Sequence, residues 1–355
     1  MQQVRKAQSE FLYTGFAWPH HDAASGYHHV VPPGFRFING ARLFFGRSNP
    51  GTWQRKLNFV LTDLYTLAIG IQYNYIIYIY PEQTAIISPW VLRHLGKKLT
   101  FVCHLKADYW TNQKDYSWRN PVVKTLAFLR GNTITQPHNI IVLNENEISS
   151  FEKISHAQVV AIPHGAFAAM PRNLEPQMWP LKEVLIIGEN YRDFALMTEI
   201  INALSVKMPG IRVGIVGIRK QWLRGLATGN YEILPRLGER EYRQRIFEAL
   251  CVILPLKYAT ANNTIFEALG EGTPVYCNAS CVGVRYYLPD EEYLFEDTED
   301  LIFKLRELIS LSPEQRRTLS DQLRSHLNEH FGWEKVRTQV ASLSLIGSTD
   351  SFSEA

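Results

Sequence analysis

Cysteine is scarce in this chain, with four residues among 355. A disulfide framework is therefore excluded, because folds that depend on one are dense in cysteine. Cys277 and Cys281 lie close together, but no second pair follows at the spacing that zinc sites use. We expect free, buried thiols and no structural metal.

A strong excess of one charge is absent as well. The formal net charge is +3, so nothing in the composition demands a nucleic-acid partner, and an anionic substrate or membrane surface is favoured only slightly. A hydrophobic content of 46% and a charged content of 20% are ordinary for a globular protein. The length is too great for one core of usual size and fits two domains.

Long uninterrupted hydrophobic runs are also missing. The segment 59–80 is long enough to span a membrane, but polar residues interrupt it and no basic flank follows. The interrupting residues are Asp63, Gln72 and Asn74. A helix over 53–69 followed by a buried strand over 75–80 is the better prediction. The N-terminus lacks the apolar core and cleavage site of a signal peptide, so we expect a cytoplasmic protein.

Short apolar runs of strand length recur along the chain, and helical patterns follow them. These runs cover 11–17, 75–80, 99–104, 139–144, 183–188, 212–217, 231–235, 251–256 and 273–278. They are continuous rather than alternating, which indicates parallel strands buried on both faces. The sequence therefore predicts two doubly wound α/β domains with a proline-rich linker, and a ligand cleft beyond the carboxyl ends of the strands.

The most informative segment follows the run 251–256. A helix is predicted to begin near Asn262, Asn263 and Thr264, whose side chains can cap its first amides. The free amides and positive dipole end of such a helix suit a phosphate or pyrophosphate. Glu267 lies about one turn further on, where its carboxylate could accept hydrogen bonds from ribose hydroxyls. The alternative is that the three polar residues only cap the helix and Glu267 only complements its dipole.

Seven segments together resemble the GT-B glycosyltransferases, especially the retaining family 4. "EALGEGTPVY" at 267–276 is similar to that family's "EAMAxGxPVV" signature. The others, in chain order, are "SGY" at 25–27, "FVCH" at 101–104, "NIIVLNENE" at 139–147, "AIPHGAF" at 161–167, "ILPRLGEREYRQRIFEALCVILPL" at 233–256 and "HFGWEKVRTQVASL" at 330–343. The likeness spans nearly the whole chain, and the order of the segments makes it specific.

The resemblance implies a GT-B fold, in which two Rossmann-like domains face a cleft. Residues 1–163, completed by a helix over 330–345, would form the acceptor-side domain, and residues 164–329 the donor-binding domain. Residues 346–355 would be a disordered tail. The implied activity is sugar transfer from a nucleotide-sugar donor to a glycan, lipid-linked or other hydroxyl acceptor, as in polysaccharide biosynthesis. Retention of anomeric configuration, no obligatory metal and no other cofactor are implied with it.

The resemblance also assigns donor-binding residues. The amides of Asn262, Asn263 and Thr264 would hold the diphosphate, and Glu267 would bind the donor ribose. Gly26 belongs to the glycine-containing loop after the first strand, on the donor side. Where the family often has a further glutamate, this chain has Ala259, so recognition of the donor sugar must differ or activity is in doubt.

Two catalytic positions follow from the same comparison. His104 would touch the transferring sugar, although a structural histidine is the alternative. The family's arginine position is occupied by Glu189, which leaves Arg192 as the cation that stabilises the leaving group. Arg219 and Lys220, after the next strand, are substitutes for it. Ordinary surface charge is the alternative for all three cations.

Acceptor contacts are expected in two loops of the first half. The loop 105–118 carries Asp108 and Trp110, a carboxylate and an aromatic ring of the kind that contact sugars, although an aromatic packing loop would look the same. His20 and His21 could serve as proton partner or base for the acceptor. With His28 and His29 nearby, the cluster could also suggest a metal site, but adjacent histidines rarely converge on one ion.

Two other functions remain open at this point. One is a nucleotide-sugar epimerase or hydrolase of the same fold, for which no convincing acid–base pair is found. The other is a non-catalytic partner that binds sugar nucleotides or glycans, which Ala259 would allow. Basic residues at 93–98 could bring the protein to the inner face of a membrane, or could simply be a solvated helix end.

Overall fold

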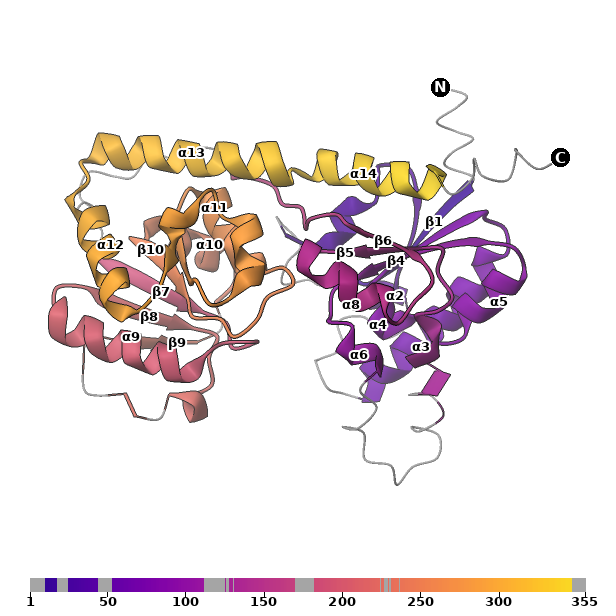
Figure 1. Cartoon of the computed structure of the whole chain (residues 1–355), viewed down its shortest axis with the longest axis horizontal. Coiled ribbons are helices and arrows are strands. Elements are labelled where there is room, and N and C mark those ends of the chain that lie inside the picture. Colours follow the sequence, from indigo (N-terminus) through magenta and orange to yellow (C-terminus); the bar gives the residue numbers. More distant parts are fainter. Residues whose placement is uncertain are drawn as a thin grey trace. The chain divides into compact units, whose positions relative to one another are not determined.

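The computed structural model contains two compact units, Met1–Gly165 together with Trp333–Ala355, and Ala166–Gly332 (Figure 1). We call them unit 1 and unit 2. The structure describes residues 10–17, 25–43, 53–111, 125, 128–129, 131–169, 182–223, 225–226, 229, 231–235 and 237–346. All but the first residue of the predicted tail at 346–355 lies outside these ranges.

Unit 1 is built on a six-stranded parallel sheet with the strand order β2-β1-β3-β4-β5-β6. The strands are β1 Phe11–Gly15, β2 Arg36–Asn39, β3 Tyr75–Ile79, β4 Lys98–Cys103, β5 Asn139–Val142 and β6 Gln158–Ala161. The α-helices are α2 Gly40–Leu43, α3 Trp53–Gly70, α4 Pro81–Thr84, α5 Ser88–His94, α6 Asp108–Thr111, α8 Ile148–Glu152 and α14 Trp333–Ile346. Short 3-10 helices are η2 Tyr27–Val30 and η4 Glu145–Glu147.

Unit 2 has a second six-stranded parallel sheet, with the order β12-β11-β10-β7-β8-β9. Its strands are β7 Glu183–Ile187, β8 Arg212–Val216, β9 Tyr231–Leu234, β10 Cys251–Leu254, β11 Val275–Asn278 and β12 Leu294–Phe295. The α-helices are α9 Phe194–Lys207, α10 Glu239–Glu248, α11 Asn263–Glu271, α12 Thr298–Ser310 and α13 Pro313–Phe331. The 3-10 helices are η6 Lys220–Trp222, η7 Val282–Tyr287 and η8 Glu291–Tyr293.

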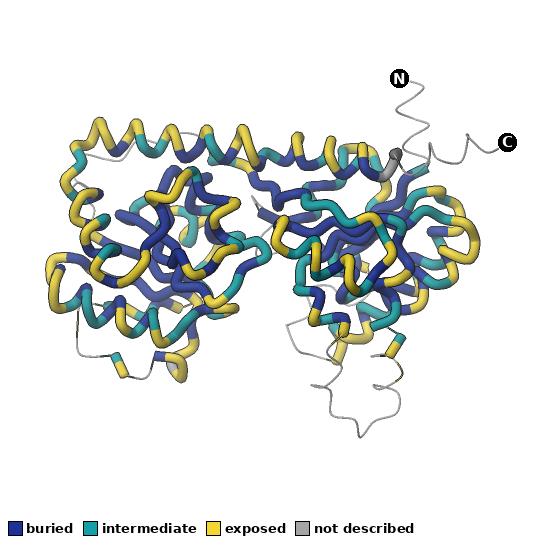
Figure 2. The backbone as a smooth tube through the Cα atoms, viewed as in Figure 1, coloured by how far each residue is buried: buried dark blue, intermediate teal, exposed yellow. Residues whose placement is uncertain are grey.

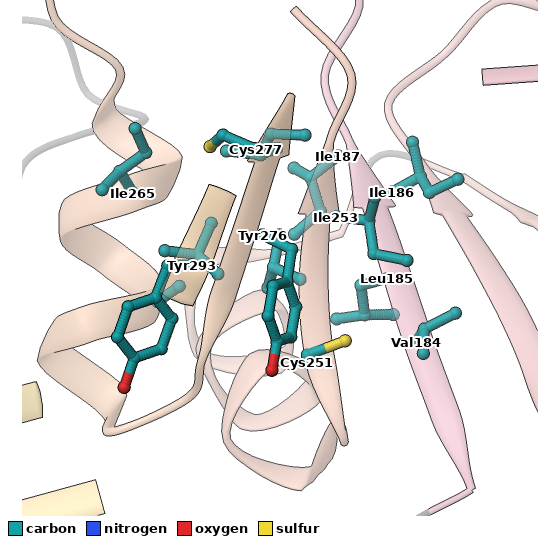
Figure 3. Close-up of a cluster of buried hydrophobic side chains, with 14 of the residues drawn as sticks. Val184, Leu185, Ile186, Ile187, Cys251, Ile253, Ile265, Tyr276, Cys277 and Tyr293 are labelled. Carbon is teal, nitrogen blue, oxygen red and sulfur yellow. The ribbon is translucent and has the colours of Figure 1, made fainter. Parts of the chain in front are cut away.

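Helices cover these sheets, so the central strands are buried except at the first residue of β3, β4 and β8 (Figure 2). In unit 2, apolar side chains such as Leu185 of β7 and Ile253 of β10 form one core with Ile265 of α11 (Figure 3). Burial on both faces explains why these strands read as continuous apolar runs. The predicted fold class, two doubly wound α/β domains, is confirmed.

The segment 59–80 is resolved as predicted, since α3 ends at Gly70 and β3 begins at Tyr75. Within the described ranges, no helix has both the length and the apolar character that crossing a membrane requires. The four cysteines are free and buried, which confirms the expectation from their number.

Each sheet has one point where the strand order reverses. In unit 1 the chain leaves β1 toward β2 on one side, and β3 lies on the other side of β1. In unit 2 the corresponding point lies between β7 and β10. Ligands of open α/β sheets bind beyond the carboxyl ends of the strands at such points, so both positions are the first places to search.

Candidate functional site

The loops that leave β7 and β10 are tied together at the reversal point of unit 2. Arg192 and Leu256 form an isolated antiparallel bridge. The amide of Lys257 donates to the carbonyl of Tyr191 at 2.9 Å, and the amide of Asp193 donates to the carbonyl of Pro255 at 2.9 Å. These contacts fix the backbone around the approach to α11.

The start of α11 agrees with the predicted helix start. Asn262 is the N-cap residue, and its side-chain oxygen accepts from the amide of Thr264 at 3.0 Å. The cap therefore uses one of the three amides assigned to a diphosphate. The amide of Asn263 donates to no other described residue, so it and the helix dipole are still available to an anion.

Glu267 lies one turn into α11 and is half-buried, between residues that are fully buried. Its Oε2 accepts a hydrogen bond of 2.7 Å from the hydroxyl of Tyr242 on α10. Burial, followed by the charge of Glu267, raises the pKa of Tyr242 well above its ordinary value. The phenol is therefore a proton donor at neutral pH. Sequence reasoning did not find Tyr242, because only the fold brings α10 against α11.

Arg192 is at the predicted strand end, but its guanidinium is turned onto its own loop. The side chain is 5% exposed, with Nε donating to the carbonyl of Ile187 at 2.9 Å and Nη1 to the carbonyl of Asn190 at 3.1 Å. Burial lowers its pKa to about 10, so it remains a cation at neutral pH. Its charge is close to the edge of the sheet, but backbone oxygens already hold three of its nitrogen groups.

Arg219 is already paired with a carboxylate. Its Nη2 lies 2.7 Å from Oε1 of Glu189, and its Nε donates to Oε2 of the same residue at 2.9 Å. These hydrogen bonds lower the pKa of Glu189. The acidic residue at the family's arginine position thus binds the arginine of the next strand end. Lys220 begins η6, and its side chain lies outside the described part of the structure.

Lys257 is an exposed cation near the start of α11 that sequence reasoning did not identify. It is in the loop between β10 and α11, and no described carboxylate lies within ion-pair distance of it. Its position directly after a buried strand was the available signal. Two residues later, Ala259 is 6% exposed and part of the hydrophobic core, so it offers no polar group.

His104 follows β4, the strand next to β3 at the reversal point of unit 1. Its Nδ1 is 3.0 Å from the carbonyl oxygen of Val102, which can only accept, so Nδ1 carries the proton and Nε2 is an acceptor. The ring stacks on Tyr80 at 3.8 Å and meets the edge of Tyr27 at 4.8 Å. Burial, with His164 nearby, lowers the pKa of His104 well below its usual range. The imidazole is therefore neutral at neutral pH.

The buried carboxylate of Glu82 holds the loop that carries His104. Glu82 is 1% exposed and accepts from the amides of His104 and, at 2.9 Å, Leu105. Tyr80, two residues earlier, has a left-handed backbone with φ 62°, which is uncommon for a residue with a side chain. A buried acid and a strained residue beside a strand end are features of functional sites, and neither was visible in the sequence.

Trp333, the first residue of α14, closes the same cluster. Its ring lies 5.4 Å from the ring of Tyr27 and 5.4 Å from that of His164. A Cβ on Gly165 would come within 2.5 Å of this indole, so glycine is needed there for space. The predicted closing helix is thus joined to unit 1 through Tyr27 and His164.

The remaining predicted residues of unit 1 are not part of the cluster described around His104. Gly26 precedes η2 with φ −70°, a backbone conformation that does not require glycine. Trp110 is 2% exposed and belongs to the core, which favours the aromatic packing loop over an acceptor contact. Asp108 is exposed at the start of α6. His20 and His21 lie outside the described residues.

Within the described ranges, no three His, Cys, Asp or Glu side chains gather where they could hold a metal ion.

Comparisons with known proteins bear on the fold and on the second half of the chain. Residues 192–342 match the family described as glycosyl transferase-like. No curated protein sequence matches the chain.

Several solved structures share the fold. HepE of Anabaena, in complex with UDP and glucose, is 10% identical with a TM-score of 0.63, over 94% of this chain and 99% of HepE. Sucrose-phosphate synthase of Thermosynechococcus elongatus is 16% identical with a TM-score of 0.59, over 98% of this chain and 94% of that one. TarM of S. aureus, in complex with UDP among other ligands, is 14% identical with a TM-score of 0.60; the match covers 81% of this chain and 59% of TarM.

Proposed function

Because the chain has the GT-B fold and its residues 192–342 match the glycosyl transferase-like family, we propose that it is a glycosyltransferase. It takes a sugar from a nucleotide-sugar donor and transfers it to a hydroxyl of a glycan or lipid-linked acceptor, with retention of configuration. The observation that carries this proposal is the position of Glu267. It lies one turn after the capped start of α11, beyond the carboxyl end of β10, and its carboxylate accepts a hydrogen bond from Tyr242. Both lie inside the matched segment.

The donor is assigned to unit 2. The amide of Asn263 and the dipole of α11 receive the diphosphate, and Lys257 supplies an exposed positive charge. Arg192 contributes a buried charge to the same edge. Glu267 accepts the ribose hydroxyls. UDP in the structures of HepE and TarM supports a nucleotide as the donor's leaving group.

Unit 1 is assigned to the acceptor and the transferring sugar. A neutral His104 with its proton on Nδ1 would accept a hydrogen bond from a sugar hydroxyl through Nε2, rather than contribute a positive charge. Stacking on Tyr80 keeps the ring in one orientation. Charge on the leaving diphosphate would be stabilised by the amides and cations of unit 2, without an obligatory metal.

A non-catalytic binding partner is the second candidate, and Ala259 is the observation that favours it. A buried alanine replaces a carboxylate that would contact donor-sugar hydroxyls. Such a protein would bind a nucleotide-sugar and a glycan without turning either over.

A panel of nucleotide-sugars tests these candidates by calorimetric binding, slow hydrolysis and turnover with hydroxyl acceptors. We expect one donor to bind and to react with an acceptor. Removal of a charged hydrogen-bonding group is worth about 2 kcal/mol, so Glu267→Ala should weaken donor binding about 30-fold. Glu307→Ala, an exposed acid on α12, is the matched control and should leave donor binding unchanged.

Each contrary outcome has a clear meaning. If Glu267→Ala bound the donor as tightly as the wild type does, the assignment of Glu267 to the donor ribose would be wrong. Binding without turnover would identify the non-catalytic partner, and formation of an epimer would identify an epimerase. If no nucleotide-sugar bound at all, the proposed function would be wrong.

We also propose a peripheral contact with the inner face of a membrane, made by α3 and α5 of unit 1. Leu57 and Leu64, seven positions apart on α3, are 37% and 44% exposed, and Val91 and Leu95, one turn apart, are 37% and 51% exposed. Arg93 lies two residues from each of the last two, so this segment carries positive charge as well as apolar groups. This combination favours an interface that contains anionic lipid.

A further inference from the structure

The hydroxyl of Tyr242 lies between two residues of α11 that are one turn apart. It donates to Oε2 of Glu267 at 2.7 Å, and it is also hydrogen-bonded to the side chain of Thr264. Tyr242 is half-buried on α10, so its ring is held by packing while its hydroxyl reaches the neighbouring helix.

The direction of these hydrogen bonds follows from the chemistry of the three groups. A carboxylate only accepts, so the proton of Tyr242 must be directed to Glu267. Burial and the charge of Glu267 raise the pKa of the phenol well above its ordinary value, which keeps that proton in place at neutral pH. Thr264 must then donate to the phenol oxygen. The result is a directed chain from Thr264 through Tyr242 to Glu267.

This chain of hydrogen bonds fixes the orientation of the carboxylate. A glutamate side chain has several rotatable bonds, and ordering them on binding would weaken the affinity for a ligand. Each carboxylate oxygen has two lone pairs, so Oε2 can accept from Tyr242 and from a ligand hydroxyl at the same time. A fixed carboxylate plane suits a rigid pair of adjacent hydroxyls, as in ribose.

From this geometry we propose that Tyr242 is a positioning residue that makes Glu267 selective for ribose over deoxyribose. The proposal rests on the function proposed above. Tyr242 itself would not contact the nucleotide, and it would act through the orientation of Glu267.

The test compares each ribonucleoside diphosphate with its 2′-deoxy analogue by calorimetry. ADP, GDP, UDP and CDP are screened first on the wild-type protein, and the tightest pair is kept. Tyr242→Phe removes only the hydroxyl and should weaken the ribonucleotide about 10-fold, as expected for loss of a hydrogen bond to a charged group. The affinity for the 2′-deoxy analogue should stay the same. Tyr276→Phe, at a buried phenol of β11 in the same unit, is the matched control and should change neither value.

A double variant shows whether Tyr242 acts through Glu267. The double variant Tyr242→Phe and Glu267→Gln should show the same preference for the ribonucleotide over its 2′-deoxy analogue as Glu267→Gln alone. The two residues act as one unit, so loss of the Tyr242 hydroxyl should have no further effect. If Tyr242→Phe fails to fold, as judged by its thermal transition, Thr264→Val removes the first donor of the chain and should lower the same ribose preference.

The proposal is overturned if Tyr242→Phe weakens both nucleotides equally, since that pattern indicates a general structural role. It is also overturned if the wild type binds a nucleotide but does not prefer ribose. A wild type that binds no nucleotide at all would instead refute the proposed function, and with it this inference.

Discussion

His138 is a residue whose surroundings oppose its protonation. It is half-buried, and Arg93 and Lys98 add positive charge around it. Burial is the first cause, and with the two cations it lowers the pKa of His138 to about 4. The unfolded chain, where a histidine titrates near 6.5, therefore binds this proton at a higher pH than the folded chain does.

This difference predicts the sign of an acid effect on stability. Between about pH 6.5 and pH 4 the unfolded state holds more protons, so the free energy of unfolding falls as the pH falls. His138→Asn should lose less stability than the wild type between pH 7 and pH 4.5, measured by urea denaturation. His156→Asn, at an exposed position, is the control. An identical acid loss in His138→Asn and wild type would contradict the prediction.

The individual site residues differ in how far the sequence could predict them. Asn262 and Glu267 were accessible, because a cap and a carboxylate one turn apart are a local pattern. Tyr242 and Glu82 were not, since each acts on a residue about 22 or 25 positions away, and only tertiary packing defines such pairs. Arg219 was identified as a cation, but its neutralisation by Glu189 depends on the adjacency of β7 and β8.

Among the elements, α5 has its first backbone amides capped by a side chain from another helix, α3. Asp63 of α3 is 1% exposed and accepts from the amides of Ile86 at 3.1 Å, Ile87 at 2.7 Å and Ser88 at 3.2 Å. It also accepts from the hydroxyl of Ser88. A polar residue that appeared to interrupt a hydrophobic run thus serves as a remote helix cap.

Removal of this cap should be costly. Asp63→Ala leaves three amide donors without their acceptor, two of them in buried hydrogen bonds, and should lower the free energy of unfolding by about 3 kcal/mol or more. Asp193→Ala, at the more exposed cap of α9, should cost only about 1 kcal/mol. Urea denaturation of both variants checks this. Equal losses would show that Asp63 is no more than an ordinary cap.

The strands missed by sequence analysis share one position in the fold. β2, β6 and β12 are all edge strands, and they contain only four, four and two residues. An edge strand is covered less completely, so its sequence lacks the continuous apolar run that identified the central strands. The interior strands of both sheets were predicted from such runs, and β9 is the one edge strand in the described structure that was predicted as well.

For the whole molecule, the exposed apolar residues of α3 and α5 lead to a prediction about lipid. Full-length protein should float with vesicles that contain anionic phosphatidylglycerol and should bind neutral phosphatidylcholine vesicles less. Leu64→Ser combined with Leu95→Ser should lower the vesicle partition coefficient by up to about 1000-fold, because each leucine buried in lipid contributes about 2 kcal/mol. Val206→Ser, at an exposed position on α9 of unit 2, is the control. Flotation that is unchanged in the double variant would exclude these residues as the contact.

The arrangement of the two units along the chain has a consequence for biosynthesis. Unit 2 is one continuous stretch, Ala166–Gly332, whereas unit 1 consists of two pieces on either side of it. Trp333 follows directly and packs against Tyr27 and His164, which a ribosome would have produced long before. Unit 2 thus forms its core from one continuous stretch of chain, but unit 1 must wait for α14. Until then the aromatic cluster around Tyr27 lacks its indole, and this unfinished surface is the part of the nascent protein that a chaperone would have most reason to bind.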